Sequence, residues 1–297
     1  MRNKFLIIVL ATLMLFVACK TNSTNNGEKA FTGEYIISAK DAVKKIGDKN
    51  TIFIDARGGD DKTIEGAISL AWPALAISDI ANNEPGWGII PSREDLAARL
   101  SSLGIDKDKD IILFSTTSQG WGEDGRILWV LEAAGYDDVK MVDGGVNALI
   151  ASGAKMESDP TTLAPAEVDI DEIDRDHVIN TDELTRDYTK YVVVDSREKN
   201  EYDGAVLYGE TKGGHLPGAI NIPFTSLFNS DGYLKSNDEL KKLFKDAGLK
   251  EDQDIVTYCT GGIRSGYMQL VMDMCGYDDV KNYEGSYYSW SAVNDVE

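Results

Sequence analysis

The sequence predicts an α/β fold that occurs twice along the chain. Its 297 residues are enough for about two domains of roughly 100–200 residues each. Short apolar runs rich in β-branched residues alternate with amphipathic helical stretches, and the pattern recurs at offsets of 140–144 residues. Strands that are separated by helices pair in parallel, and a parallel sheet is covered on both faces. We therefore expect two mainly parallel sheets, each flanked by helices.

Matching segments show the repeat most clearly. The sequence GYDDVK occurs at residues 135–140 and again at residues 276–281. Residues 94–114 match residues 238–258 at an offset of 144. Self-similarity at a fixed offset is typical of a duplicated structural unit. One domain has therefore been used twice in this chain.

The segment between the two repeats has the composition of a linker. Residues 157–174 contain Pro160, Pro165 and the acidic run DIDEID. Proline interrupts regular elements, and clustered acidic residues stay at the surface. We expect a first domain over residues 34–156 and a second domain over residues 175–297.

The sequence of each half predicts helices and strands in the same order. Helices are expected to start after Ser38 and Asn180, where Asp41 and Glu183 complete capping patterns. The strands are expected at the apolar runs of residues 51–57, 111–114 and 140–143, and at residues 191–197, 255–258 and 281–284. Helical periodicity covers residues 96–104, 240–248 and 267–277.

The N-terminus has the layout of a processing signal. A positive start is followed by an apolar run that ends at Ala18 and is too short for a typical membrane span. The segment FVAC, residues 16–19, resembles the lipobox of bacterial lipoproteins, in which the signal is cleaved before a cysteine that carries the lipid. We expect a signal peptide over residues 1–18, lipidation of Cys19 and a flexible tether over residues 19–33. The folded part would then lie outside the cytoplasm, anchored to a bacterial membrane.

Composition excludes several classes of function. The chain has 50 acidic against 30 basic residues, a formal charge of −20, so it repels nucleic acid and anionic membrane surfaces. Membrane contact is therefore expected only through the lipid anchor. Three Cys and two His do not suit a zinc cluster or a disulfide framework. We expect a monomer without a metal or a cofactor.

A cysteine-containing loop in the second half has the features of an anion site. Residues 259–266 read CTGGIRSG and lie between an apolar run and a helical stretch. A thiol at a helix N-terminus has a lowered pKa because the unpaired N–H groups favour the thiolate. Gly261 and Gly262 let successive N–H groups converge, and Arg264 adds a positive charge. The loop is predicted to be an anion cradle with Cys259 as its nucleophile.

Not every cysteine near a strand or helix is reactive. A cysteine that ends a strand is more often part of the core than a nucleophile. For Cys259 the glycines, the arginine and the helix start favour catalysis instead. Cys275 lies on the apolar side of the following helical stretch and is predicted to pack in the core.

The run YCTGGIRS resembles the active-site loop of the rhodaneses, the thiosulfate sulfurtransferases, in which a Cys and an Arg enclose four residues. The second half is also similar to that family in Asp195-Ser196-Arg197, in GHLPGAINIPF and in YEGSYYSW. The first half has weaker versions, IEGAISLAWP and VDGGVNALIASG. The resemblance implies two rhodanese-like domains, of which the first is catalytically silent. Ser115 falls where the second half has Cys259, and a hydroxyl cannot replace a thiolate.

The resemblance implies a double displacement. The Cys259 thiolate attacks the outer sulfur of thiosulfate, sulfite leaves, and a persulfide remains in the loop. A thiol or cyanide acceptor then removes that sulfur. The substrate-binding residues implied by the resemblance are those of the loop: Thr260, Gly261, Gly262, Ile263 and Arg264.

Further residues are expected to support the loop. The resemblance implies that Asp195 and Arg197 brace it, although the pair also suits a purely structural role. Ser265, next to Arg264, is assigned a supporting role. Phe224 is expected either to screen the persulfide from water or to pack in the core, and Trp121 is a weaker candidate for the same wall.

Loop length separates sulfur transfer from phosphate chemistry. Cysteine phosphatases that resemble this fold place five residues between Cys and Arg, which gives a wider cradle. Here four residues separate Cys259 from Arg264, and Ser265 stands at the longer spacing. Sulfur transfer is therefore favoured over phosphate or arsenate chemistry.

Three readings of the sulfur chemistry stay open. Mercaptopyruvate sulfurtransferases usually lack the terminal Arg of the loop and often have an Arg before the aromatic residue that follows Asp-x-Arg. This chain has Arg264, and Glu201 before Tyr202, so thiosulfate is favoured over mercaptopyruvate. Thr260 replaces the Arg of the common Cys-Arg start, and modest thiosulfate turnover is expected. The remaining alternative is a persulfide-carrying lipoprotein that delivers sulfur with little turnover.

Overall fold

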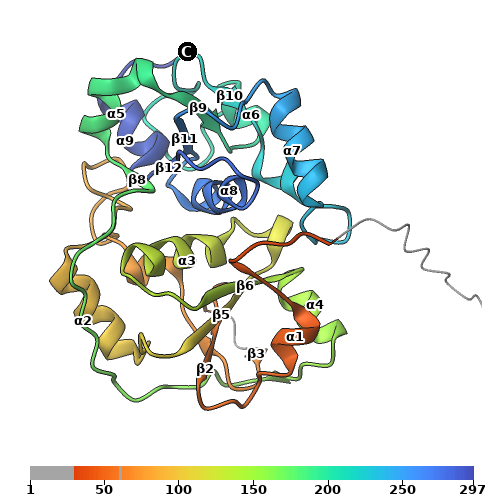
Figure 1. The fold of residues 1–297 in the computed structure, drawn as a ribbon. Coiled ribbons are helices and arrows are strands. Elements are labelled where there is room, and N and C mark those ends of the chain that lie inside the picture. Colours follow the sequence, from red (N-terminus) through yellow and green to blue (C-terminus); the bar gives the residue numbers. More distant parts are fainter. Residues whose placement is uncertain (1–29, 60–61) are drawn as a thin grey trace, which may run out of the picture.

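The computed structural model describes residues 30–59 and 62–297, and these form two five-stranded parallel sheets flanked by helices (Figure 1). The first sheet has the order β1 (Ile36–Ser38), β6 (Val139–Asp143), β5 (Asp110–Phe114), β2 (Thr51–Asp55) and β4 (Ile68–Ser69). The second has the order β8 (Val178–Ile179), β12 (Val280–Tyr283), β11 (Ile255–Tyr258), β9 (Val192–Asp195) and β10 (Ile220–Asn221). The two orders are equivalent, so the predicted α/β class with two mainly parallel sheets is confirmed.

The helices follow the same duplicated plan. The first domain contains α1 (Ala39–Val43), α2 (Arg93–Leu103), α3 (Glu123–Ala133) and α4 (Gly145–Ala151). The second contains α5 (Thr181–Asp187), α6 (Lys199–Tyr202), α7 (Asn237–Asp246), α8 (Ile263–Asp273) and α9 (Ser286–Val293). The side chains of Ser38 and Asn180 accept hydrogen bonds from backbone N–H groups of α1 and α5, as their capping patterns predict. Within the described residues, no helix has the length and apolar character that a membrane span requires.

The end of the predicted tether and the expected linker both contact the folded domains. Residues 1–29, with the predicted signal peptide and Cys19, lie outside the described residues. The end of the predicted tether is not free, because Phe31 is buried and the Thr32 N–H donates to Asn237 Oδ1 at 3.0 Å. The expected linker begins at the end of β7 (Met156–Glu157), a strand that pairs with β3 (Thr63–Ile64). Within the linker, Ile170 is buried against the core.

The two domains share one core. Figure 1 shows α3 and α8 side by side between the two sheets. A Cβ atom on Gly125 of α3 would lie 2.5 Å from Cδ2 of Tyr267 on α8, so glycine permits this close approach. One cluster of buried apolar side chains includes residues of both domains. The second-domain site is therefore built against the first domain.

The carboxyl edge of the first sheet carries no cysteine. Ser115 follows β5 as Cys259 follows β11, and it is fully buried. Seven residues separate Ser115 from the start of α3, whereas three separate Cys259 from the start of α8. The buried carboxyl group of Asp124 lies beside the Ser115 hydroxyl, with which it hydrogen-bonds. The first edge therefore presents a carboxyl group where the second presents a cradle of N–H groups.

The carboxyl group of Asp124 is expected to make stability depend on pH. Burial, with the nearby charge of Glu123, raises its pKa to about 7. Between about pH 4 and pH 7 the folded protein thus binds a proton that the unfolded chain has lost, so stability falls as pH rises. We predict that Asp124→Asn raises the free energy of unfolding by about 1–4 kcal/mol at pH 8, and by much less near pH 4.

Chemical denaturation at several pH values measures this difference. The exposed Asp137→Asn variant is the matched control and is expected to show no gain that grows with pH. A gain from Asp124→Asn that is independent of pH, or a loss at high pH, contradicts the interpretation.

Candidate active site

Cys259 lies at the carboxyl end of the central strand of the second sheet. It follows β11 directly, and α8 begins at Ile263 after the N-cap residue Gly262. Ligands in parallel α/β sheets bind at this edge because the helix N-termini point toward it. The Cys259 N–H donates to the Ser286 hydroxyl at 3.1 Å, and the Cys259 carbonyl accepts from the Tyr287 N–H at 3.0 Å. These bonds fix the backbone on both sides of the thiol.

The sulfur is surrounded by donors. The Gly262 N–H donates to the Cys259 Sγ at 3.2 Å. Burial raises the pKa of the thiol, but the charge of Arg264, the N–H and hydroxyl of Ser265 and the N–H of Gly261 outweigh that effect, and the net pKa is lowered. The side chain is only 1% exposed. The predicted cradle of main-chain N–H groups around Cys259 is thus present in the geometry.

A physical constraint explains why glycine occupies both positions 261 and 262. Gly262 adopts a left-handed conformation with φ of 84°, which glycine allows without strain. A Cβ atom on Gly261 would lie 2.8 Å from the Trp87 ring of the first domain. The glycines therefore serve the curl of the loop and the close approach of the opposing domain.

Arg264 does not stand alone at the rim of the loop. Its Nη1 donates to Oε2 of Glu201 on α6, and its Nη2 donates to Oε1, both at 2.7 Å. The Thr260 hydroxyl donates to Glu201 Oε1 at 3.0 Å and accepts from Arg264 Nη2 at 2.9 Å. Arg264, Glu201 and Thr260 are all buried. The sequence shows Glu201 only as a departure from a related pattern, four residues after Arg197, without a role.

A small aromatic cavity opens above Arg264 and Thr260. Its volume is about 60 Å³, and its remaining walls are the rings of Trp87, Trp121, Tyr208 and Tyr288. The first domain supplies both tryptophans. Trp87 meets the Tyr288 ring edge-on at 5.2 Å, and Trp121 meets the Tyr208 ring at 5.4 Å. The silent half of the chain therefore contributes half of the aromatic wall.

Phe224 does not line this cavity. Its side chain is fully buried, and its ring packs against Phe228 at 5.1 Å and Tyr267 at 5.3 Å, facing Gly122 of the first domain. Of its two expected roles, core packing describes the observed position. Trp121, the weaker candidate for the wall, is the one of the pair that lines the cavity.

The other predicted supporting residues contact the loop in different ways. Arg197 and Asp195 form a buried ion pair at 2.6 Å, and Asp195 accepts from the Tyr258 hydroxyl, next to Cys259 in the chain. The pair therefore reaches the loop through Tyr258. Ser265 donates its hydroxyl to Asn282 and directs its N–H toward the sulfur. Ile263 begins α8 and is buried.

Arg126 is a cation from the first domain that sequence reasoning missed. It is 1% exposed, and it donates to the carbonyl oxygens of Gly262, at 3.2 Å, and of Gly88. Burial lowers its pKa to about 10, while the charges of Glu284 and Cys259 act in the opposite direction. Gly262 is thus held at its carbonyl by Arg126 while its N–H points to the Cys259 sulfur. No local pattern marks an arginine that lies 133 residues before Cys259.

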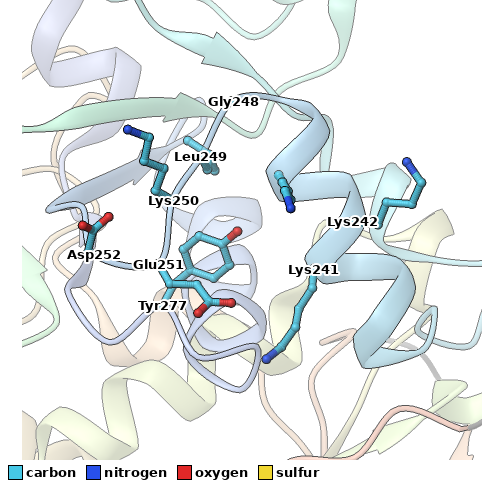
Figure 2. Close-up of a pocket in the computed structure, with 9 residues that line it drawn as sticks. Lys241, Lys242, Gly248, Leu249, Lys250, Glu251, Asp252 and Tyr277 are labelled. Carbon is cyan, nitrogen blue, oxygen red and sulfur yellow. The ribbon is translucent and has the colours of Figure 1, made fainter.

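A larger hollow lies elsewhere, and the described residues that line it include no cysteine. Its volume is about 970 Å³, and Figure 2 shows lysine side chains of α7 and Lys250 around it. Cys275 is buried in the core, as predicted, and burial raises its pKa to about 12. Cys259 differs from Cys275 in its lowered pKa and in the donors that surround its sulfur.

Comparisons with known proteins identify the family of the chain. The family model described as "Rhodanese-like domain" matches residues 38–152 and 180–293. The "Sulfur carrier protein TtuD" of Thermus thermophilus is 30% identical over 217 residues, which cover 67% of this chain and 74% of that protein. A Saccharopolyspora erythraea protein named "Putative thiosulfate sulfurtransferase" is 28% identical over 272 residues, which cover 88% and 94%.

Solved structures show the same fold. The crystal structure of SseA from Escherichia coli, described among "3-mercaptopyruvate sulfotransferases" with the rhodanese fold, aligns with a TM-score of 0.73 at 23% identity. That alignment covers 86% of this chain and 99% of the other. With both repeats matched by one family model, the chain belongs to the rhodanese family as a sulfurtransferase with two rhodanese-like domains.

Proposed function

We propose that the protein moves a sulfane sulfur from thiosulfate to a thiol or cyanide acceptor through a persulfide on Cys259. In the first step the thiolate forms a bond to the outer sulfur of thiosulfate, and the S–S bond of thiosulfate breaks. The bonding pair leaves with sulfite, so the two negative charges of thiosulfate depart on sulfite and the persulfide keeps one. In the second step the acceptor forms a bond to the outer sulfur, and the Cys259 thiolate is regenerated.

The convergence of donors on Cys259 Sγ carries this proposal. The N–H groups of Gly261, Gly262 and Ser265 favour the thiolate over the thiol, so no separate base is needed to begin the reaction. The same donors suit the terminal sulfur anion of a persulfide. Four aromatic side chains wall the cavity above Arg264 and Thr260 and limit the space open to water there.

The choice of thiosulfate rests on the loop and on relatives. Four residues between Cys259 and Arg264 favour a sulfur atom over a phosphate ester, and the N–H groups of the loop favour an anionic donor. The relative from Saccharopolyspora erythraea supports the same donor. A mouse relative named "3-mercaptopyruvate sulfurtransferase" supports the alternative donor, although Arg264 departs from the loop pattern of that class.

A sulfur-delivery role is the second candidate. The relative named as a sulfur carrier and the nearly complete burial of Cys259 both favour a persulfide that is formed and then kept until a partner thiol arrives. Enzyme and carrier share the same first step and differ in turnover. We further propose that the protein works outside the cytoplasm, anchored through a lipid on Cys19.

Persulfide formation is the first prediction of this function. Incubation with thiosulfate is expected to add one sulfur atom to the intact protein, measured by mass spectrometry. Cys259→Ser is expected to lose the addition because a hydroxyl in the cradle stays protonated and unreactive, whereas Cys275→Ala keeps it. Added cyanide should remove the sulfur with continuous thiocyanate production.

Each outcome of this experiment is decisive. Robust turnover that Cys259→Ser abolishes supports the enzyme, and a stable sulfur adduct without turnover supports the carrier. A protein that gains no sulfur, or a Cys259→Ser variant that gains as much as the wild type, contradicts the proposal.

The anchor gives a separate prediction. In bacterial cells fed a labelled fatty acid, the full-length protein is expected to carry label and to sediment with membranes, because the lipid on Cys19 holds it there. Cys19→Ala is expected to lose the label and to leave the membrane fraction. Label that persists in Cys19→Ala would show that Cys19 is not the lipidated residue.

A further inference from the structure

The buried carboxylate of Glu201 balances the positive charge of Arg264 in the Cys259 loop. The guanidinium of Arg264 and the carboxylate of Glu201 form two parallel bonds of 2.7 Å, and their side chains are 8% and 1% exposed. The Thr260 hydroxyl and the Glu198 N–H also donate to this carboxylate. Glu201 is therefore fixed in place by both the loop and its own helix.

Glu201 is charged in this environment. Burial raises its pKa, but the hydrogen bonds and charge of Arg264, with further bonds from the Glu198 N–H and the Thr260 hydroxyl, lower it overall. Arg264 is ionised at all working pH values. The two side chains therefore form a pair with no net charge at neutral pH.

The rest of the cavity wall adds no charge. Of the six described residues that line it, Arg264 is the charged one, and the others are Thr260 and four aromatic residues. Arg126 lies behind the loop, where its guanidinium is bound to the carbonyl groups of Gly262 and Gly88. A donor that enters the cavity thus meets the Arg264 side of a neutralised ion pair, Thr260 and four aromatic rings.

This arrangement discriminates among donors by their charge. The attraction of Arg264 and the repulsion of Glu201 both scale with donor charge, so Glu201 removes more binding free energy from a dianion than from a monoanion. We propose that Glu201 is a specificity-determining residue that shifts the site from dianionic sulfur donors, such as thiosulfate, toward singly charged ones. This inference rests on the proposed persulfide chemistry at Cys259.

Two donors of the same shape test the proposal. Methanethiosulfonate replaces one oxygen anion of thiosulfate by a methyl group and carries one negative charge. With either donor the Cys259 sulfur bonds to the outer sulfur, the donor S–S bond breaks, and the pair leaves with methanesulfinate or sulfite. The rate of persulfide formation against donor concentration gives a second-order rate constant for each donor.

The measured quantity is the ratio of the thiosulfate to the methanethiosulfonate rate constant. Glu201→Gln keeps the shape of the side chain and removes its charge, so the ratio is expected to rise at least about fivefold. Asp203→Asn is the matched control because it removes one charge from the exposed end of the same segment, and its ratio should stay within about twofold of the wild type. A loss of packing alone would slow both donors and leave the ratio unchanged.

A second variant keeps the proposal testable if Glu201→Gln does not fold. Thr260→Lys adds a cation at the position whose hydroxyl contacts both members of the ion pair, and is expected to raise the same ratio. An unchanged or lowered ratio in folded Glu201→Gln, or in Thr260→Lys if the first variant is unfolded, overturns the role of Glu201. A wild-type protein that forms no persulfide with either donor instead overturns the proposed function.

Discussion

The proposed function depends on holding a sulfur anion in a buried position. An unpaired charge in a protein interior is unstable, so a buried thiol normally stays protonated. Cys275 is such a thiol, and burial raises its pKa to about 12. Cys259 is buried to nearly the same extent, yet its pKa is lowered. The difference lies in the loop, which turns its N–H groups toward one sulfur because Gly262 accepts a left-handed conformation and α8 begins there.

The two domains cooperate in building this site. The second domain provides the nucleophile, the loop and the Glu201–Arg264 pair. The first domain provides Trp87 against Gly261, and Arg126 on the carbonyl group of Gly262. At the matching edge of the first domain, Asp124 lies beside Ser115, and this domain serves as a wall and a support for the loop of the second. Gly125 lets α3 approach α8 closely.

Local patterns in the sequence were sufficient for the fold and for the loop. The apolar runs, the caps at Ser38 and Asn180 and the repeat all depend on residues that are close in the chain, and the observed sheets follow them. The parts that could not be predicted depend on contacts between distant segments. Glu201 meets Arg264 across 63 positions, and Arg126 reaches Gly262 from the other domain. Phe224 and Trp121 illustrate the same limit, because an aromatic residue type alone does not say which ring faces the cavity.

The protonation state of Cys259 tests the central claim most directly. In a Cys275→Ala background, the ultraviolet absorbance of the thiolate can be followed against pH and corrected with the matching Cys259→Ser protein. The account predicts a pKa below the ordinary thiol value of about 8.5, because the N–H groups and Arg264 outweigh burial. A pKa above that value would show that burial dominates, and would contradict a preformed thiolate in the loop.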